Sequence, residues 1–151
     1  MEEFEDQFSE SQTDMILICM EYVEDRADRV YVYASCEQGI ISSRFFYLIN
    51  DTHVKCHKVN DALRVGDEQY DVSGNRQSMV LRILCEDIEK IKALCTEYRK
   101  EMPTEMKLIY DVKSGRFTAE YKYDLLYTND DVKTATHMYN EWFEEVKKKK
   151  L

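Results

Sequence analysis

The sequence predicts an α+β fold in which one mainly antiparallel sheet is covered by helices, in the order α-β-β-β-α-β-β-α. A length of 151 residues is enough for one domain with a substantial core. The chain has four glycines and one proline, too few for the many turns of a sandwich. Aromatic residues make up 12% of the chain, which argues against disorder. We therefore expect residues 1–151 to form a single domain that ends in a short lysine-rich tail.

The first half of the chain predicts one helix and three strands. Over residues 3–24, apolar side chains recur at intervals of three, four or seven, which is typical of an amphipathic helix. Residues 29–36 alternate valine with tyrosine and predict a strand buried on both faces. After the turn at Gly39, residues 40–49 predict a second strand, and residues 53–59 predict a more polar edge strand. The short links favour antiparallel pairing.

The second half predicts a helix, a hairpin and a closing helix. Residues 60–75 are rich in glycine, asparagine and aspartate, and we expect them to be the longest and most mobile loop. From Arg76 the apolar pattern becomes helical and ends before Pro103. The alternating segments 106–112 and 117–123 then predict a hairpin with a tight turn between them.

The closing helix is predicted from its capping residues and its apolar face. Asn129, Asp130 and Asp131 have the short polar side chains preferred at helix N-termini. Lysines at residues 147–150 stand where the helix dipole favours positive charge. We expect its inward face to consist of Val132, Ala135, Tyr139, Trp142, Phe143 and Val146.

Negative charge is concentrated at the start of the chain. The whole chain has 30 acidic and 21 basic residues, for a net charge of −9. Residues 1–28 contain ten acids and one base, so their sum is also −9 and the remainder is balanced. Such a surface repels phosphate backbones, so we expect no direct nucleic-acid binding and a basic protein partner instead. The alternative is that the acids serve solubility alone.

Cysteines and histidines give a weak metal signal. The five cysteines are scattered without a CxxC pair, which is typical of reduced thiols in a cytosolic protein. His53, Cys56 and His57 form the best candidate metal cluster, but no second ligand cluster accompanies them. No apolar run approaches the roughly 18 residues of a membrane helix, and the acidic N-terminus is unlike a secretory signal. We expect a cytoplasmic protein with no metal, cofactor or membrane partner.

Catalytic motifs are missing from the sequence. The chain has no GxGxxG, GxxxxGK[ST], GxSxG or HExxH pattern. Adjacent acid pairs such as Glu24 and Asp25 fall on or beside predicted helices, where solvated surface charge explains them. We therefore expect a protein that is not an enzyme.

Tyrosine and aspartate gather in and after the second predicted hairpin. Tyr110, Tyr121 and Tyr123 follow the alternation of the buried face, so packing in the core is the favoured interpretation. Tyrosine is also enriched at interfaces because it offers a large contact area for little rotamer entropy. We predict that the partner binds where the hairpin ends, through Asp124, Tyr127, Asp130 and Asp131.

Several segments resemble the YezG-like immunity proteins, over residues 10–146. The run from Asp28 to Ala34 resembles an early strand of that family, and residues 106–124 resemble its second hairpin with an aromatic and acidic exit. The closing aromatic helix with Trp142 fits the same layout. The family includes EsaG-type antitoxins, which neutralise polymorphic toxins of bacterial competition.

The resemblance implies an immunity protein without chemistry of its own. Its partner would be the C-terminal domain of a cognate toxin, often a basic nuclease, bound tightly and stoichiometrically. An acidic, tyrosine-bearing surface is suited to compete for a basic phosphate-binding surface. The alternative is a small acidic regulatory or adaptor domain that binds a cellular protein through the same face.

Overall fold

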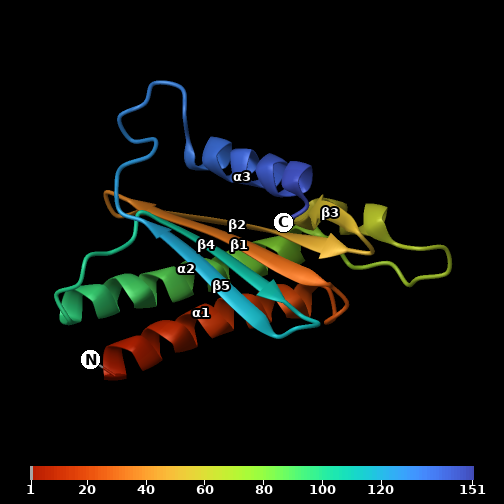
Figure 1. Ribbon diagram of the computed structural model, residues 1–151, viewed down its shortest axis with the longest axis horizontal. Coiled ribbons are helices and arrows are strands. Elements are labelled where there is room, and N and C mark those ends of the chain that lie inside the picture. Colours follow the sequence, from red (N-terminus) through yellow and green to blue (C-terminus); the bar gives the residue numbers. More distant parts are fainter. Residues whose placement is uncertain (1) are drawn as a thin grey trace.

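The computed structural model describes residues 2–151 and places one sheet between two helical layers (Figure 1). Helices α1 and α2 lie side by side on one face, and α3 lies on the opposite face. No helix of residues 2–151 is long and apolar enough to cross a bilayer. The elements are α1 (Glu2–Tyr22), β1 (Arg29–Glu37), β2 (Ile40–Ile49), β3 (Thr52–Lys55), the 3-10 helix η1 (Cys56–Ala62), α2 (Gly74–Glu97), β4 (Glu105–Asp111), β5 (Arg116–Lys122) and α3 (Ala135–Lys149).

The five strands form one antiparallel sheet in the order β3-β2-β1-β4-β5. β1 is central, so Val32 lies opposite Phe45 on one side and opposite Leu108 on the other. Every residue of β1 after Arg29 is buried, as its alternation of valine and tyrosine predicts. The predicted α+β class and the predicted order of helices and strands are confirmed, and η1 is the one addition within residues 2–151.

Successive side chains of β1 enter two separate cores. Val30 and Val32 face α1 and α2, whereas Tyr31 and Tyr33 face α3. On the α3 side the Phe46 ring packs edge-on against Trp142 and Phe143 of α3, each with 5.0 Å between ring centroids. Aromatic packing therefore holds α3 against the sheet. The α3-side core consists of Tyr31, Tyr33, Phe46, Tyr139, Trp142, Phe143 and Val146.

The third strand is shorter than its sequence pattern predicts. We expected it over residues 53–59, but β3 ends at Lys55 and the chain continues as η1. Val59 and Ala62 of η1 are buried. Their spacing of three residues matches one turn of a 3-10 helix, so this conformation turns both toward the core.

The loop expected over residues 60–75 is reduced to residues 63–73 by η1 and α2. Asn60 ties this loop to η1, because its side chain accepts a hydrogen bond from the Tyr70 N–H at 2.7 Å and donates one to the Tyr70 carbonyl at 3.1 Å. Tyr70 itself is buried against the core. The middle of the loop is therefore attached at a point that the sequence pattern does not reveal.

The closing helix begins later than its sequence predicts. Its N-cap is Thr134, whose hydroxyl accepts from the His137 N–H while the His137 ring accepts from the Thr134 N–H. Residues 129–131 lie upstream in the loop, so the prediction that they cap the helix is wrong. Val132, expected to face inward, is outside the helix and 74% exposed. Of the remaining predicted inward residues, Tyr139, Trp142, Phe143 and Val146 are buried as expected, whereas Ala135 is only partly buried.

The hairpin tyrosines only partly fill the core. Tyr110 packs against the larger core, but Tyr121 is 38% exposed and Tyr123 is 47% exposed. Tyr121 receives a hydrogen bond from Gln12 at 2.7 Å and packs edge-on against Phe8. Because β5 is an edge strand, α1 covers its side chains incompletely.

Candidate partner-binding surface

The loop of residues 123–134, here called the β5–α3 loop, contains the four residues that the sequence predicts to bind a partner. Figure 1 shows it in blue, running from the end of β5 to α3 on the face opposite α1 and α2. Thr104 fixes its beginning, because the Thr104 hydroxyl donates to the carbonyls of Lys122 and Asp124, at 3.1 and 2.6 Å. The loop therefore starts from a defined position at the edge of the sheet.

The carboxylate of Glu37, the last residue of β1, holds the middle of the loop. Glu37 is 1% exposed. One of its oxygens accepts from the Leu126 N–H at 2.8 Å. The other accepts from the Tyr127 N–H at 3.3 Å, the Thr128 N–H at 3.0 Å and the Thr128 hydroxyl at 2.5 Å. One buried side chain thus fixes three consecutive residues of the loop.

Two opposing effects act on the pKa of Glu37. Burial raises it, whereas the hydrogen bonds from the Thr128 hydroxyl and from the loop N–H groups lower it. The hydrogen bonds prevail, so the pKa lies below its ordinary value of 4.5. Glu37 is therefore ionised at neutral pH, and its bonds to the loop are charge-assisted.

The side chains of Tyr127 and Asp130 are both engaged, Tyr127 with β1 and Asp130 with the loop itself. The half-buried Tyr127 places its hydroxyl 3.0 Å from the Ser35 hydroxyl, and burial raises the pKa of Tyr127. Asp130 accepts from the N–H groups of Val132 and Lys133 at 2.8 and 2.9 Å, and these bonds lower the pKa of Asp130. These two predicted site residues therefore also shape the loop.

Asp124, Asp130 and Asp131 are all exposed, and of these three the Asp130 side chain is engaged by N–H groups of the loop itself. Apolar side chains lie beside them in the chain: Leu125 is 43% exposed and Val132 is 74% exposed. Val132 also lines a shallow hollow of about 530 Å³ at the first turns of α3, together with His137. Exposed apolar groups bordered by acids are the composition expected of a protein-binding surface.

A buried polar cluster lies beneath the loop and was not predicted from the sequence. Glu105 on β4 is 2% exposed and accepts from the Tyr33 hydroxyl at 2.7 Å. The Lys107 amine lies 3.7 Å from the same carboxylate. The available sequence signal was an acid at one end of each of two strands with apolar centres, Glu37 in β1 and Glu105 in β4, because a buried acid requires polar partners.

The histidines and the cysteine of the candidate metal cluster have other surroundings. His53 lies 3.3 Å from the Tyr31 hydroxyl, and the Cys56 thiol lies 3.9 Å from the Gln77 side-chain oxygen. His57 is exposed. Within residues 2–151, no group of three or more histidine, cysteine, aspartate or glutamate side chains could hold a metal ion.

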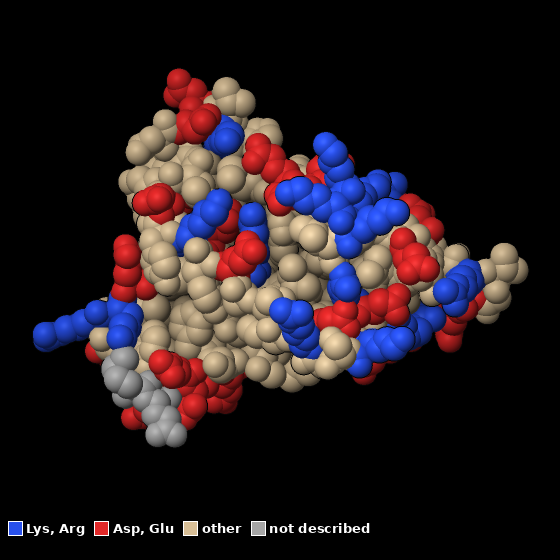
Figure 2. Space-filling model, in the orientation of Figure 1, with Lys and Arg blue, Asp and Glu red and all other residues tan. Residues whose placement is uncertain are grey.

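Charge is unevenly distributed over the surface. Figure 2 shows acidic side chains at the tip of the β5–α3 loop and near the start of α1, and a dense basic patch over the end of α3. The last turn of α3 carries Lys147, Lys148 and Lys149. A basic partner would therefore be attracted to the loop or to α1 and repelled from the end of α3. No family model and no curated protein matches the chain, so the resemblance to the YezG-like immunity proteins stays a prediction.

Proposed function

We propose that this chain is an immunity protein that binds and neutralises a cognate bacterial toxin, with a basic nuclease domain as the expected partner. The observation that carries the proposal is the β5–α3 loop. Its backbone is held by the buried Glu37 carboxylate, while Asp124 and Asp131 stay exposed beside Leu125 and Val132. Such a loop presents charge and apolar area in a fixed shape.

The β5–α3 loop favours binding through its order, its charge and its apolar side chains. A loop that is already ordered loses little conformational entropy on binding, so more of its contact energy appears as affinity. Exposed carboxylates complement the basic surface with which a nuclease holds phosphates, and the net charge of −9 accelerates the encounter. The apolar side chains beside them supply the desolvated contacts that dominate interface energies.

The experiment is coexpression with the C-terminal domain of a large reading frame encoded immediately beside this chain, which immunity predicts to be a toxin. We expect the two proteins to copurify as a stoichiometric complex and the toxin to lose its activity in cells. The double variant Asp131→Lys with Val132→Ala should bind at least ~2 kcal/mol more weakly, the size of an interface hot spot. Its melting temperature should stay close to that of the wild type, because both side chains are exposed.

The matched control is Glu68→Lys, which makes the same charge change on the exposed 63–73 loop. Figure 1 shows that loop at the far end of the molecule from the β5–α3 loop. The control should bind the toxin as the wild type does. If the double variant binds the toxin as tightly as the wild type, the β5–α3 loop is not part of the interface. A failure of the toxin to copurify would favour the adaptor alternative over immunity.

A further inference from the structure

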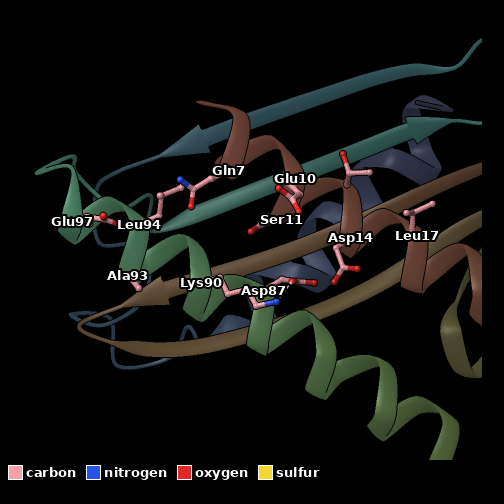
Figure 3. Close-up of a pocket in the computed structure, with 11 residues that line it drawn as sticks. Gln7, Glu10, Ser11, Asp14, Leu17, Asp87, Lys90, Ala93, Leu94 and Glu97 are labelled. Atoms are coloured by element: carbon pink, nitrogen blue, oxygen red, sulfur yellow. Dashed lines mark ion pairs between the residues drawn. The ribbon is translucent and has the colours of Figure 1, made fainter. Parts of the chain in front are cut away.

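A groove of about 730 Å³ separates α1 from α2, on the layer of the molecule away from α3 (Figure 3). Its walls carry four carboxylates, from Glu10, Asp14, Asp87 and Glu97, against the single amine of Lys90. Figure 3 shows Asp14 of α1 and Asp87 of α2 pointing toward each other across the groove. The groove therefore offers negative charge from both of its helices.

Asp87 has an unmet need for a hydrogen-bond donor. It is 2% exposed, and among residues 2–151 no N–H or O–H group donates to its buried Oδ2 atom. The Asp14 carboxyl faces Asp87 and can bond it only when the pair shares a proton. The Oδ1 atom of Asp87 lies 3.9 Å from the amine of Lys90, whose side chain is 70% exposed, so this ion pair is long and solvated. Buried carboxylate oxygens are normally bonded, and one that is not points to a ligand or a proton.

The proton is the competing occupant of this position. Burial and the facing Asp14 raise the pKa of Asp87 to about 7. Glu86 on α2 raises the pKa further, whereas Lys90 lowers it, and Glu10 on α1 adds a further carboxylate to the wall. Near neutral pH a small energetic advantage therefore decides whether a proton or another cation lies between the two aspartates.

We propose that this groove binds an arginine side chain supplied by a basic protein partner, with the guanidinium between Asp14 and Asp87. The planar guanidinium has five donors in a fixed fork. When the exposed Asp14 side chain turns aside, the guanidinium can replace the proton that the two carboxyls share and donate to both of them. Leu17, 59% exposed on the groove wall, offers an apolar surface for the arginine stem. That this partner is the toxin rests on the proposed function. That the groove binds an arginine side chain does not.

The first test uses N-acetyl-arginine amide as the probe, with N-acetyl-citrulline amide as its uncharged counterpart of the same shape. NMR titration of the full chain should show saturable shifts of the Asp14 and Asp87 carboxyl signals with the arginine probe alone. Because the probe displaces a proton from a group that titrates near 7, binding should be about tenfold tighter at pH 8 than at pH 6. Carboxyl signals that do not respond, or an affinity independent of pH, would overturn the proposal.

The second test removes the charge of Asp87. Asp87→Asn keeps the shape of the side chain and should raise the dissociation constant of the arginine probe at least about tenfold, as expected for the loss of a charged hydrogen-bond partner. The matched control is Glu86→Gln on the exposed side of α2, one residue earlier, where the carboxylate lies 4.0 Å from Arg82. The control should bind the probe within about twofold of the wild type. Equal binding by both variants would place the arginine elsewhere.

These results separate the groove from the proposed function, because no toxin takes part in either titration. If the groove binds the probe but the chain neutralises no toxin, the arginine site is supported and the immunity role is refuted. If Asp87→Asn and the wild type neutralise a toxin equally well, the immunity role is supported and the groove is not part of the interface.

Discussion

Replacing Glu37 by glutamine changes one atom at the centre of the loop attachment. The amide oxygen of the variant can take the position that accepts from Tyr127 and Thr128, but its NH₂ group then faces the Leu126 N–H, a donor against a donor. The Leu126 bond is lost, which costs about 1–3 kcal/mol for a buried unpaired group. The remaining bonds lose their ionic character and about half of their strength. We expect the free energy of unfolding to fall by about 2–4 kcal/mol.

Two measurements check this expectation. Urea denaturation should give a lower midpoint for Glu37→Gln with an unchanged slope, and the amides of Leu126 and Thr128 should exchange with solvent much faster. Because the folded pKa of Glu37 lies below 4.5, its stabilisation is present above that value and is lost as the pH falls through the folded pKa. The variant should lack this loss. The exposed Glu120→Gln change on β5 is the control and should leave the midpoint unchanged. An unchanged midpoint and unchanged exchange in Glu37→Gln would refute the attachment of the loop by this carboxylate.

Three further predictions concern the core, the groove and the encounter with a partner. Leu84→Ala or Ile91→Ala, each at a fully buried position of α2, should lower the free energy of unfolding by ~2–5 kcal/mol, and an unchanged urea midpoint would contradict the packing of α2 on the sheet. The pKa of Asp87 is raised from 3.8 to about 7, so folding stability should decline as the pH rises between these values. The full pKa difference corresponds to a change of about 4 kcal/mol in the free energy of unfolding, and because water enters the groove we expect about 2 kcal/mol. Denaturation followed across that pH range should show this decline in the wild type and not in Asp87→Asn. Stopped-flow association with a basic toxin domain should slow markedly between low and moderate salt, with little change in dissociation, and a salt-independent rate would remove electrostatic steering.

The order of helices and strands could be predicted because its signals are local. The alternation in β1 marks a strand buried on both faces, and the apolar seam of α2 marks a helix, without knowledge of their neighbours. The start of α3 could not be decided in this way. Residues 129–131 and Thr134 all have side chains suited to cap a helix, and the selection of Thr134 depends on its reciprocal bonds with His137.

The candidate sites show the same division between local and distant signals. The acids and Tyr127 were found from their proximity in the sequence, and they do share one loop. The residue that organises the loop was missed, because Glu37 lies about 90 positions away from the groups it binds. The pairing of Asp14 with Asp87 was missed for the same reason, since it exists only once α1 and α2 pack together.

The strand order also fixes when the sheet can be completed as the chain leaves the ribosome. β1, β2 and β3 follow one another directly and can pair as soon as they emerge. The other edge of β1 has to wait for β4, which follows the whole of η1 and α2. Until then the most buried strand of the protein presents a free edge, the condition that invites pairing with a second chain. Arg29 and Asp111 form an ion pair at 2.7 Å, at the end of the matched positions of β1 and β4. This pair can secure the register when β4 joins β1.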